Sequence, residues 1–111
     1  MTYSRWDVVA VSYPFIEGTE AKRRPALIVS TDALHSGRGL YWAVMITTAK
    51  AGTQPDDLPI AEPAKAGLPM DCVVRVSRLT TLSDQQIDRR LGTISPQLRN
   101  AVGGLLRKYA G

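Results

Sequence analysis

Residues 22–31, KRRPALIVST, place three consecutive cations directly before a short apolar run. The run Ala26–Val29 is rich in β-branched residues and is followed by polar residues, which predicts a buried strand. Pro25 has no N–H to donate to a ladder, so we expect it at the first position of that strand, with an extended backbone at Arg24. The arginines are thus held at the start of a rigid strand, where their planar, permanently charged guanidinium groups can bind phosphate oxygens. A solvated loop without a ligand is the alternative interpretation of so short a basic run.

The length and composition predict one globular domain over residues 1–111. A chain of 111 residues is long enough for a single core but not for two. Its net charge of +4 and pI of about 9.6 permit a polyanionic partner without requiring one. Cys72 is the only cysteine, which excludes an intrachain disulfide and favours a reducing compartment. The apolar stretch near the N-terminus is too short for a signal peptide or a membrane span, so we expect a cytoplasmic protein.

Short extended segments recur along the chain. Their composition predicts strands at 6–13, 26–30, 41–48, 57–61, 71–77 and 89–94, with an extended backbone over 78–82. Pro59 confines the fourth of these strands to the edge of a sheet. Within 71–77, Arg75 alternates with valines, which indicates that one face of this strand borders a polar groove. Thr47 and Thr48 end another strand, where hydroxyls serve as simple β-formers or as donors to a phosphate in a cleft.

Helical signals are few until the end of the chain. Ser83 and Gln86 form a capping box for a short helical turn, and Ser95 followed by Pro96 marks the start of a longer amphipathic helix. Many short strands with one terminal helix predict a mainly β α+β domain, a strongly bent antiparallel sheet or partly open barrel capped by helix.

The connections carry the remaining candidate groups. The loop 15–21 delivers Glu17 and Glu20 just before the arginines, either as ion-pair partners or as proton acceptors in a site. Glycines on both sides of Arg38 indicate a turn or short loop in 31–40, where we expect His35 to face solvent. It is the only histidine, and no second His, Cys or carboxylate stands at ligand spacing from it, so we expect no metal site.

Five segments in this order and spacing resemble the MazF/PemK family of toxins from type II toxin–antitoxin modules. They are RWDVVAVSYPF (5–15), EGTEAKRRPALIVS (17–30), VMITT (44–48), GLPMDCVVRVSRLTTLS (67–83) and RRLGTIS (89–95). The resemblance covers the chain from about Arg5 to the end of the terminal helix. It implies an SH3-like barrel, a homodimer and an endoribonuclease that cuts single-stranded mRNA at short sequences without ribosome, metal or cofactor. The implied chemistry is attack of a 2′-OH on the adjacent phosphorus, which leaves 2′,3′-cyclic phosphate and 5′-OH ends. An antitoxin with an acidic tail is the implied protein partner, and a basic groove suits it electrostatically.

The resemblance also implies roles for individual residues. Arg24, directly before the proline, matches the family's catalytic arginine and would stabilise the pentavalent phosphorane. Thr47 matches its catalytic or phosphate-binding hydroxyl, and Glu20 matches a loop glutamate that acts as general base or orients one. The residues implied in RNA contact are Lys22, Arg23, Thr48, Arg75, Ser77 and Arg78, with Phe15 as a stacking surface.

Two positions depart from the pattern. Thr19 stands where some members carry a histidine, and Ser77 stands where many carry an acidic residue, which places more of the proton transfer on Glu20. A catalytically weak, nucleic-acid-binding or regulatory member is therefore one alternative. Another is a non-enzymatic toxin of the CcdB type that inhibits DNA gyrase by contact, for which the ending from Tyr109 to Gly111 is a faint match.

Overall fold

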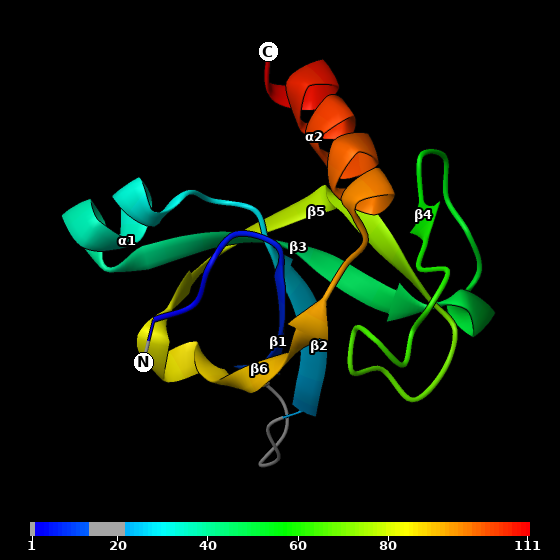
Figure 1. The fold of residues 1–111 in the computed structure, drawn as a ribbon, viewed down its shortest axis with the longest axis horizontal. Helices are drawn as coiled ribbons and strands as arrows, with labels where there is room; N and C mark the ends of the chain where they lie inside the picture. The colour runs from blue at the N-terminus through cyan, green and yellow to red at the C-terminus, as the bar shows by residue number, and fades with distance from the viewer. Residues whose placement is uncertain (1, 14–21) are drawn as a thin grey trace.

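The computed structural model describes residues 2–13 and 22–111, which form one six-stranded antiparallel sheet and two helices (Figure 1). The sheet order is β4-β5-β3-β2-β1-β6, so that β4 and β6 are its edges. The strands are β1 (Asp7–Tyr13), β2 (Lys22–Ile28), β3 (Leu40–Thr48), β4 (Leu58–Pro59), β5 (Cys72–Ser83) and β6 (Ile87–Thr93). The helices are α1 (Asp32–Arg38) and α2 (Pro96–Ala110), with 3₁₀ turns η1 (Ala49–Ala51) and η2 (Asp84–Gln86). The predicted α+β class with a bent antiparallel sheet is confirmed, and Pro59 lies on an edge strand as expected.

β2 begins earlier than the sequence indicates. Pro25 lies in the middle of this strand, opposite Ala10 of β1, and not at its first position. The proline is tolerated because pairing between β2 and β3 begins only at Ala26, opposite Met45. Up to Pro25 the strand therefore has a partner on the β1 side alone, and a missing N–H on the other side breaks no ladder bond.

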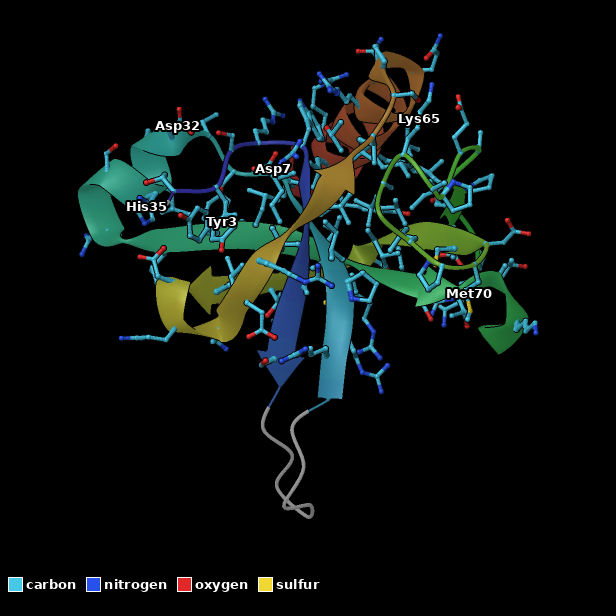
Figure 2. All side chains as sticks on the ribbon, turned by 60° about the horizontal axis from the view of Figure 1, so that its bottom comes forward. Tyr3, Asp7, Asp32, His35, Lys65 and Met70 are labelled. Carbon is cyan, nitrogen blue, oxygen red and sulfur yellow. The ribbon has the colours of Figure 1, made fainter. Side chains whose placement is uncertain are left out.

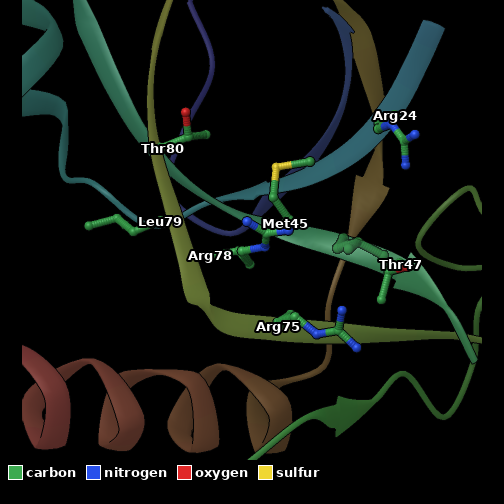
Figure 3. Close-up of a pocket in the computed structure, with 8 residues that line it drawn as sticks. Arg24, Met45, Thr47, Arg75, Arg78, Leu79 and Thr80 are labelled. Carbon is green, nitrogen blue, oxygen red and sulfur yellow. The ribbon is translucent and has the colours of Figure 1, made fainter. Parts of the chain in front are cut away.

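A bulge in β5 shapes the candidate site. Val44 of β3 pairs with Leu79, and the next residue, Met45, pairs with Arg75, so that residues 76–78 are left out of the ladder. Such a bulge bends a strand and increases its twist, and the bend of β5 is visible in Figure 3. In a regular strand Arg75 and Arg78 would point to opposite faces, because side chains alternate. The bulge instead brings both side chains to one groove.

Both faces of the sheet are buried, each by its own core. One core includes Val8, Leu27 and Val44 and is covered by α2, whose Val102 is fully buried. The other is built around Val9 and residues such as Tyr41 and Leu82. Adjacent residues of β1 thus enter different cores, so its nearly continuous valine run is covered on both sides.

The start of α2 is also as predicted. Ser95 is its N-cap, with Oγ accepting from the N–H of Leu98 at 3.3 Å, and Pro96 is the first helical residue. No helix in the described ranges 2–13 and 22–111 has the length and apolar character needed to cross a membrane.

The connection between β4 and β5 packs backbone to backbone against β6. A Cβ placed on Gly92 would lie 2.5 Å from the carbonyl oxygen of Lys65 and 2.6 Å from the carbonyl carbon of Ala66. Gly67 adopts a positive φ of 75° and faces Leu91 in the same way. Glycine at both positions therefore lets the connection close over the edge of the sheet.

The predictions for residues 31–40 are wrong in two respects. The segment forms the helix α1, which ends at Gly39 in the left-handed conformation, and His35 does not face solvent freely. Its side chain is 22% exposed, its ring stacks on Tyr41 with centroids 4.6 Å apart, and Nε2 lies 3.0 Å from Oδ2 of Asp84. Figure 2 shows His35 and Tyr3 together at this end of the sheet.

The hydrogen bond from His35 lowers the pKa of the Asp84 carboxyl, to which the Tyr41 hydroxyl also donates. His35 therefore anchors α1 to the sheet.

Candidate functional site

A groove of about 480 Å³ opens where β2, β3 and β5 lie side by side (Figure 3). Three arginines and one threonine of the sequence prediction meet in it from these three strands. The residues that line the groove are Arg24, Met45, Ile46, Thr47, Arg75, Arg78, Leu79 and Thr80. A second hollow adjoins it across Arg24, Ile46 and Thr47, and adds Arg23, Pro25, Thr48 and Cys72.

Arg24 and Arg78 are exposed cations with no fixed counter-ion in the described structure. Neither side chain makes a hydrogen bond or an ion pair with any residue in 2–13 or 22–111. Arg23 differs, because its Nε lies 2.7 Å from Oδ2 of Asp88 on β6, although its side chain remains 73% exposed. Two unpaired guanidinium groups in one concave site attract anions and raise their local concentration.

Thr47 lines the same groove as these cations. It is the penultimate residue of β3, partly buried, and its side chain belongs to both the groove and the adjoining hollow. A hydroxyl in this position can donate to an oxygen of an anion held by Arg24. The strand end therefore supplies a neutral donor beside two charged ones.

Arg75 is a different kind of arginine from its neighbours. Its Nε donates to Oδ1 of Asp57 at 3.1 Å and its Nη2 donates to Oδ2 at 2.9 Å, a two-pronged ion pair in which the side chains are 13% and 3% exposed. Nη2 also donates to the carbonyl of Gly52 at 3.2 Å. The guanidinium holds the pKa of the Asp57 carboxyl below its usual range. Most of the charge of Arg75 is thus neutralised within the fold.

The Asp57–Arg75 pair predicts a dependence of stability on acid. A carboxyl whose pKa is lowered in the folded state contributes stability above its unfolded pKa of about 3.9, and this contribution is lost as pH falls through the folded value. We expect the free energy of unfolding of the wild type to fall below about pH 4 more steeply than that of Asp57→Asn. Urea denaturation across this range measures the difference, and parallel acid profiles for the two proteins would refute it.

The structure brings most of the predicted residues together, but not all of them. Arg24, Thr47, Arg75 and Arg78 share one groove, and Arg23 and Thr48 line the adjoining hollow. Ser77 lines a separate, mainly apolar hollow with Leu79, Leu106 and Tyr109 below the end of α2. The side chain of Lys22, and Glu20 and Phe15 altogether, lie outside the described residues.

Sequence reasoning missed Asp57 as the partner of Arg75, and it missed Met45, Leu79 and Thr80 as lining residues. The two consecutive aspartates at 56 and 57 were the available signal for a carboxylate opposite an arginine among valines. Among the residues that the structure describes, no group of three or more His, Cys, Asp or Glu side chains is placed to hold a metal ion.

Comparison with known proteins identifies the fold and the family. No curated protein sequence matches the chain. The chain is similar to MazF in a MazE–MazF crystal structure from Deinococcus radiodurans, with 24% identity, a TM-score of 0.79 and coverage of 98% of this chain and 96% of that chain. It is also similar to an endoribonuclease crystallised with its cognate antitoxin from a mycobacterial species, with 23% identity, a TM-score of 0.73 and coverage of 98% and 93%. A third similar structure is the Mycobacterium tuberculosis toxin MazF-mt6, with 18% identity, a TM-score of 0.72 and coverage of 92% and 93%.

These identities establish a shared fold, whereas the family follows from a sequence model that matches residues 4–109. The chain belongs to the PemK-like, MazF-like toxins of type II toxin–antitoxin systems.

Proposed function

We propose that this family member is a toxin that acts as a metal-independent endoribonuclease on single-stranded mRNA, in the groove of Arg24, Thr47 and Arg78. The observation that carries the proposal is a pair of guanidinium groups, without counter-ions among residues 2–13 and 22–111, in one groove with a threonine hydroxyl. RNA supplies what this site lacks, because each phosphate is an anion that an arginine fork can bind through two hydrogen bonds.

The proposed reaction uses the substrate's own nucleophile. The 2′-OH attacks the adjacent phosphorus and loses its proton, the bond from phosphorus to the 5′ oxygen breaks, and that oxygen takes up a proton. The products are a 2′,3′-cyclic phosphate and a 5′-OH. Negative charge grows on the non-bridging oxygens in the pentavalent state, where Arg24 and Arg78 stabilise it and Thr47 donates a hydrogen bond.

Proton transfer needs a group that the described wall of the groove does not supply. Its lining residues include no carboxylate and no imidazole, and arginine is a poor proton shuttle because it stays protonated. We assign the general base to Glu20, which stands two residues before β2 and four before Arg24. Glu20→Gln is expected to slow cleavage at saturating RNA while leaving RNA affinity nearly unchanged. Cleavage at the wild-type rate by this variant would exclude Glu20 from proton transfer.

The remaining assignments follow from position. Arg23, Thr48 and Lys22 would extend the phosphate contacts along β2 and the end of β3, and Phe15 would stack on a base. The similar solved structures include a mycobacterial endoribonuclease in complex with its cognate antitoxin and a MazE–MazF structure. For this chain we propose a homodimer in the cytoplasm and an antitoxin that competes with RNA for the same basic groove.

The proposal is tested with purified protein, free of antitoxin, on a long single-stranded RNA in EDTA. We expect cuts at a recurrent short sequence, and ends that carry a 2′,3′-cyclic phosphate and a 5′-OH. Intact RNA from a folded sample would contradict the proposal and favour a member that binds nucleic acid without cutting it. For the CcdB-like alternative, the Tyr109 hydroxyl donates to Asp56, while the residue remains 47% exposed.

A further inference from the structure

We infer that Asp57 is a positioning residue, which fixes the direction of the Arg75 guanidinium in the groove and cancels its charge. The inference rests on the proposed function, because it concerns how the same groove holds RNA. It assigns different tasks to three neighbouring arginines. Arg24 and Arg78 attract phosphate by net charge, whereas Arg75 offers hydrogen bonds of fixed direction without net attraction.

The contacts of Arg75 fix its orientation. Two of its nitrogens are held by the two oxygens of one carboxylate, at 3.1 and 2.9 Å, and the carbonyl of Gly52 accepts a third bond. Such a planar, two-pronged pair leaves the guanidinium little rotational freedom. Its third nitrogen, Nη1, has no hydrogen-bond partner in 2–13 or 22–111, and Arg75 lines the groove on the same side as Thr47 (Figure 3). One edge of the guanidinium therefore remains for a ligand.

The carboxylate is itself held in place. Oδ2 of Asp57 accepts the N–H of Gln54 at 2.7 Å, and the N–H of Asp57 donates to the carbonyl of Gln54 at 3.1 Å. The preceding residue, Asp56, accepts from Lys108 at 3.2 Å and from the Tyr109 hydroxyl, both at the end of α2. The loop 52–57 is thus anchored to β5 on one side and to α2 on the other. Asp57 cannot follow the arginine into the groove as a mobile counter-ion would.

Charge cancellation at this position has a consequence for RNA. Three unpaired guanidinium groups in one groove would strengthen binding to any polyanion, because attraction to phosphate carries no sequence information. With Arg75 paired, two net cations remain, and the third arginine contributes only where a phosphate or a base edge meets its free nitrogen. Asp57 thereby lowers the non-specific affinity for RNA and favours the binding mode in which the scissile phosphate is correctly placed.

The test compares the wild type with Asp57→Asn and with Glu62→Gln. Glu62 is a surface carboxylate paired with Lys65 in the connection after β4, so its replacement changes the net charge equally without releasing an arginine. The binding probe is a single-stranded RNA with every ribose 2′-O-methylated, which has no nucleophile, and the cleavage substrate is the unmodified RNA of the same sequence.

We expect Asp57→Asn to bind the probe more tightly than the wild type at low salt. The slope of log binding constant against log salt concentration should become more negative by about 0.7. Its cleavage rate at saturating RNA is expected to fall about 10- to 100-fold because the phosphate is misplaced. Glu62→Gln should match the wild type in both measurements. A purely structural role for Asp57 would lower the melting temperature without changing the salt slope, and that result would overturn the inference.

The outcomes separate this inference from the proposed function. If the wild type binds the probe but leaves unmodified RNA intact, the proposed function fails while the salt slopes still test Asp57. If the wild type cleaves and Asp57→Asn cleaves and binds like Glu62→Gln, the inference fails and the proposed function stands.

A measurement on the wild type alone covers the case in which Asp57→Asn does not fold. We expect the Nε–H proton of Arg75 to exchange with solvent much more slowly than that of Arg24 in NMR spectra without RNA. Arg75 is hydrogen-bonded and only 13% exposed, whereas Arg24 is exposed and has no hydrogen-bond partner in 2–13 or 22–111. Equal exchange at the two arginines would overturn the inference.

Discussion

Arg24→Ala is expected to reduce the rate of RNA cleavage about 100- to 1000-fold, the loss typical for removal of one preorganised donor to a developing oxyanion. The fold should tolerate this change. Arg24 is exposed and has no partner in the described structure, so its removal leaves no buried group unsatisfied, and the free energy of unfolding should stay within about 0.5 kcal/mol of the wild type. Single-turnover cleavage kinetics and urea denaturation measure the two quantities separately.

The matched control for this variant is Arg38→Ala. Arg38 is also an exposed arginine, but it lies at the end of α1 and is not among the residues that line the groove. It changes the net charge by the same amount, so its cleavage rate should remain close to that of the wild type. Equal losses in both variants would mean that the protein attracts RNA by its overall charge, and would contradict a catalytic task for Arg24.

Gly92→Ala is expected to produce the largest loss of stability, about 3 kcal/mol or more, since overpacking against a rigid neighbour is costly. The added Cβ would lie 2.5 Å from the Lys65 carbonyl oxygen and 2.6 Å from the Ala66 carbonyl carbon. These are backbone atoms next to a fully buried residue, Ala66, so no side chain can rotate away to make room. The midpoint of urea denaturation measures the effect, with cleavage retained in the fraction that remains folded.

Gly37→Ala serves as the control for that substitution. A Cβ on Gly37 meets nothing within 4 Å, and Gly37 lies inside α1, where alanine is favoured over glycine by about 1 kcal/mol. This variant should therefore be as stable as the wild type or slightly more stable. Similar destabilisation by both alanines would show that the contact between β6 and the β4–β5 connection is not the cause.

The sequence predicts the strands of this fold well because their signals are local. β-branched runs mark β1 and β3, and Ser95 with Pro96 marks the start of α2. α1 was missed for an equally physical reason: none of its residues is buried, so it has no apolar stripe for periodicity to detect. It is held instead by His35 and Asp84, which are 49 residues apart in the chain.

The residues of the candidate site likewise fall into those that local sequence predicts and those that only the tertiary structure reveals. Arg24 and Thr47 follow from a local motif, and the strand order then brings them together. Asp57 and the grouping of Arg75 with Arg78 depend on tertiary structure, namely a loop that returns to β5 and a bulge that breaks its alternation. A regular strand predicts opposite faces for these two arginines, so strand periodicity cannot place them in one groove, and only the family resemblance implied that both contact RNA.

The location of bound RNA on the protein is the direct test of whether the groove of Arg24, Thr47 and Arg78 is the RNA-binding site. Backbone amide signals of the wild type can be followed by NMR during titration with a single-stranded RNA in which every ribose is 2′-O-methylated. We expect shifts that concentrate at Arg24, at residues 45–47, at Arg75 and at residues 78–80, which line the groove. Shifts confined to α1, to the outer face of α2 or to the β4–β5 connection, with the groove unaffected, would contradict it.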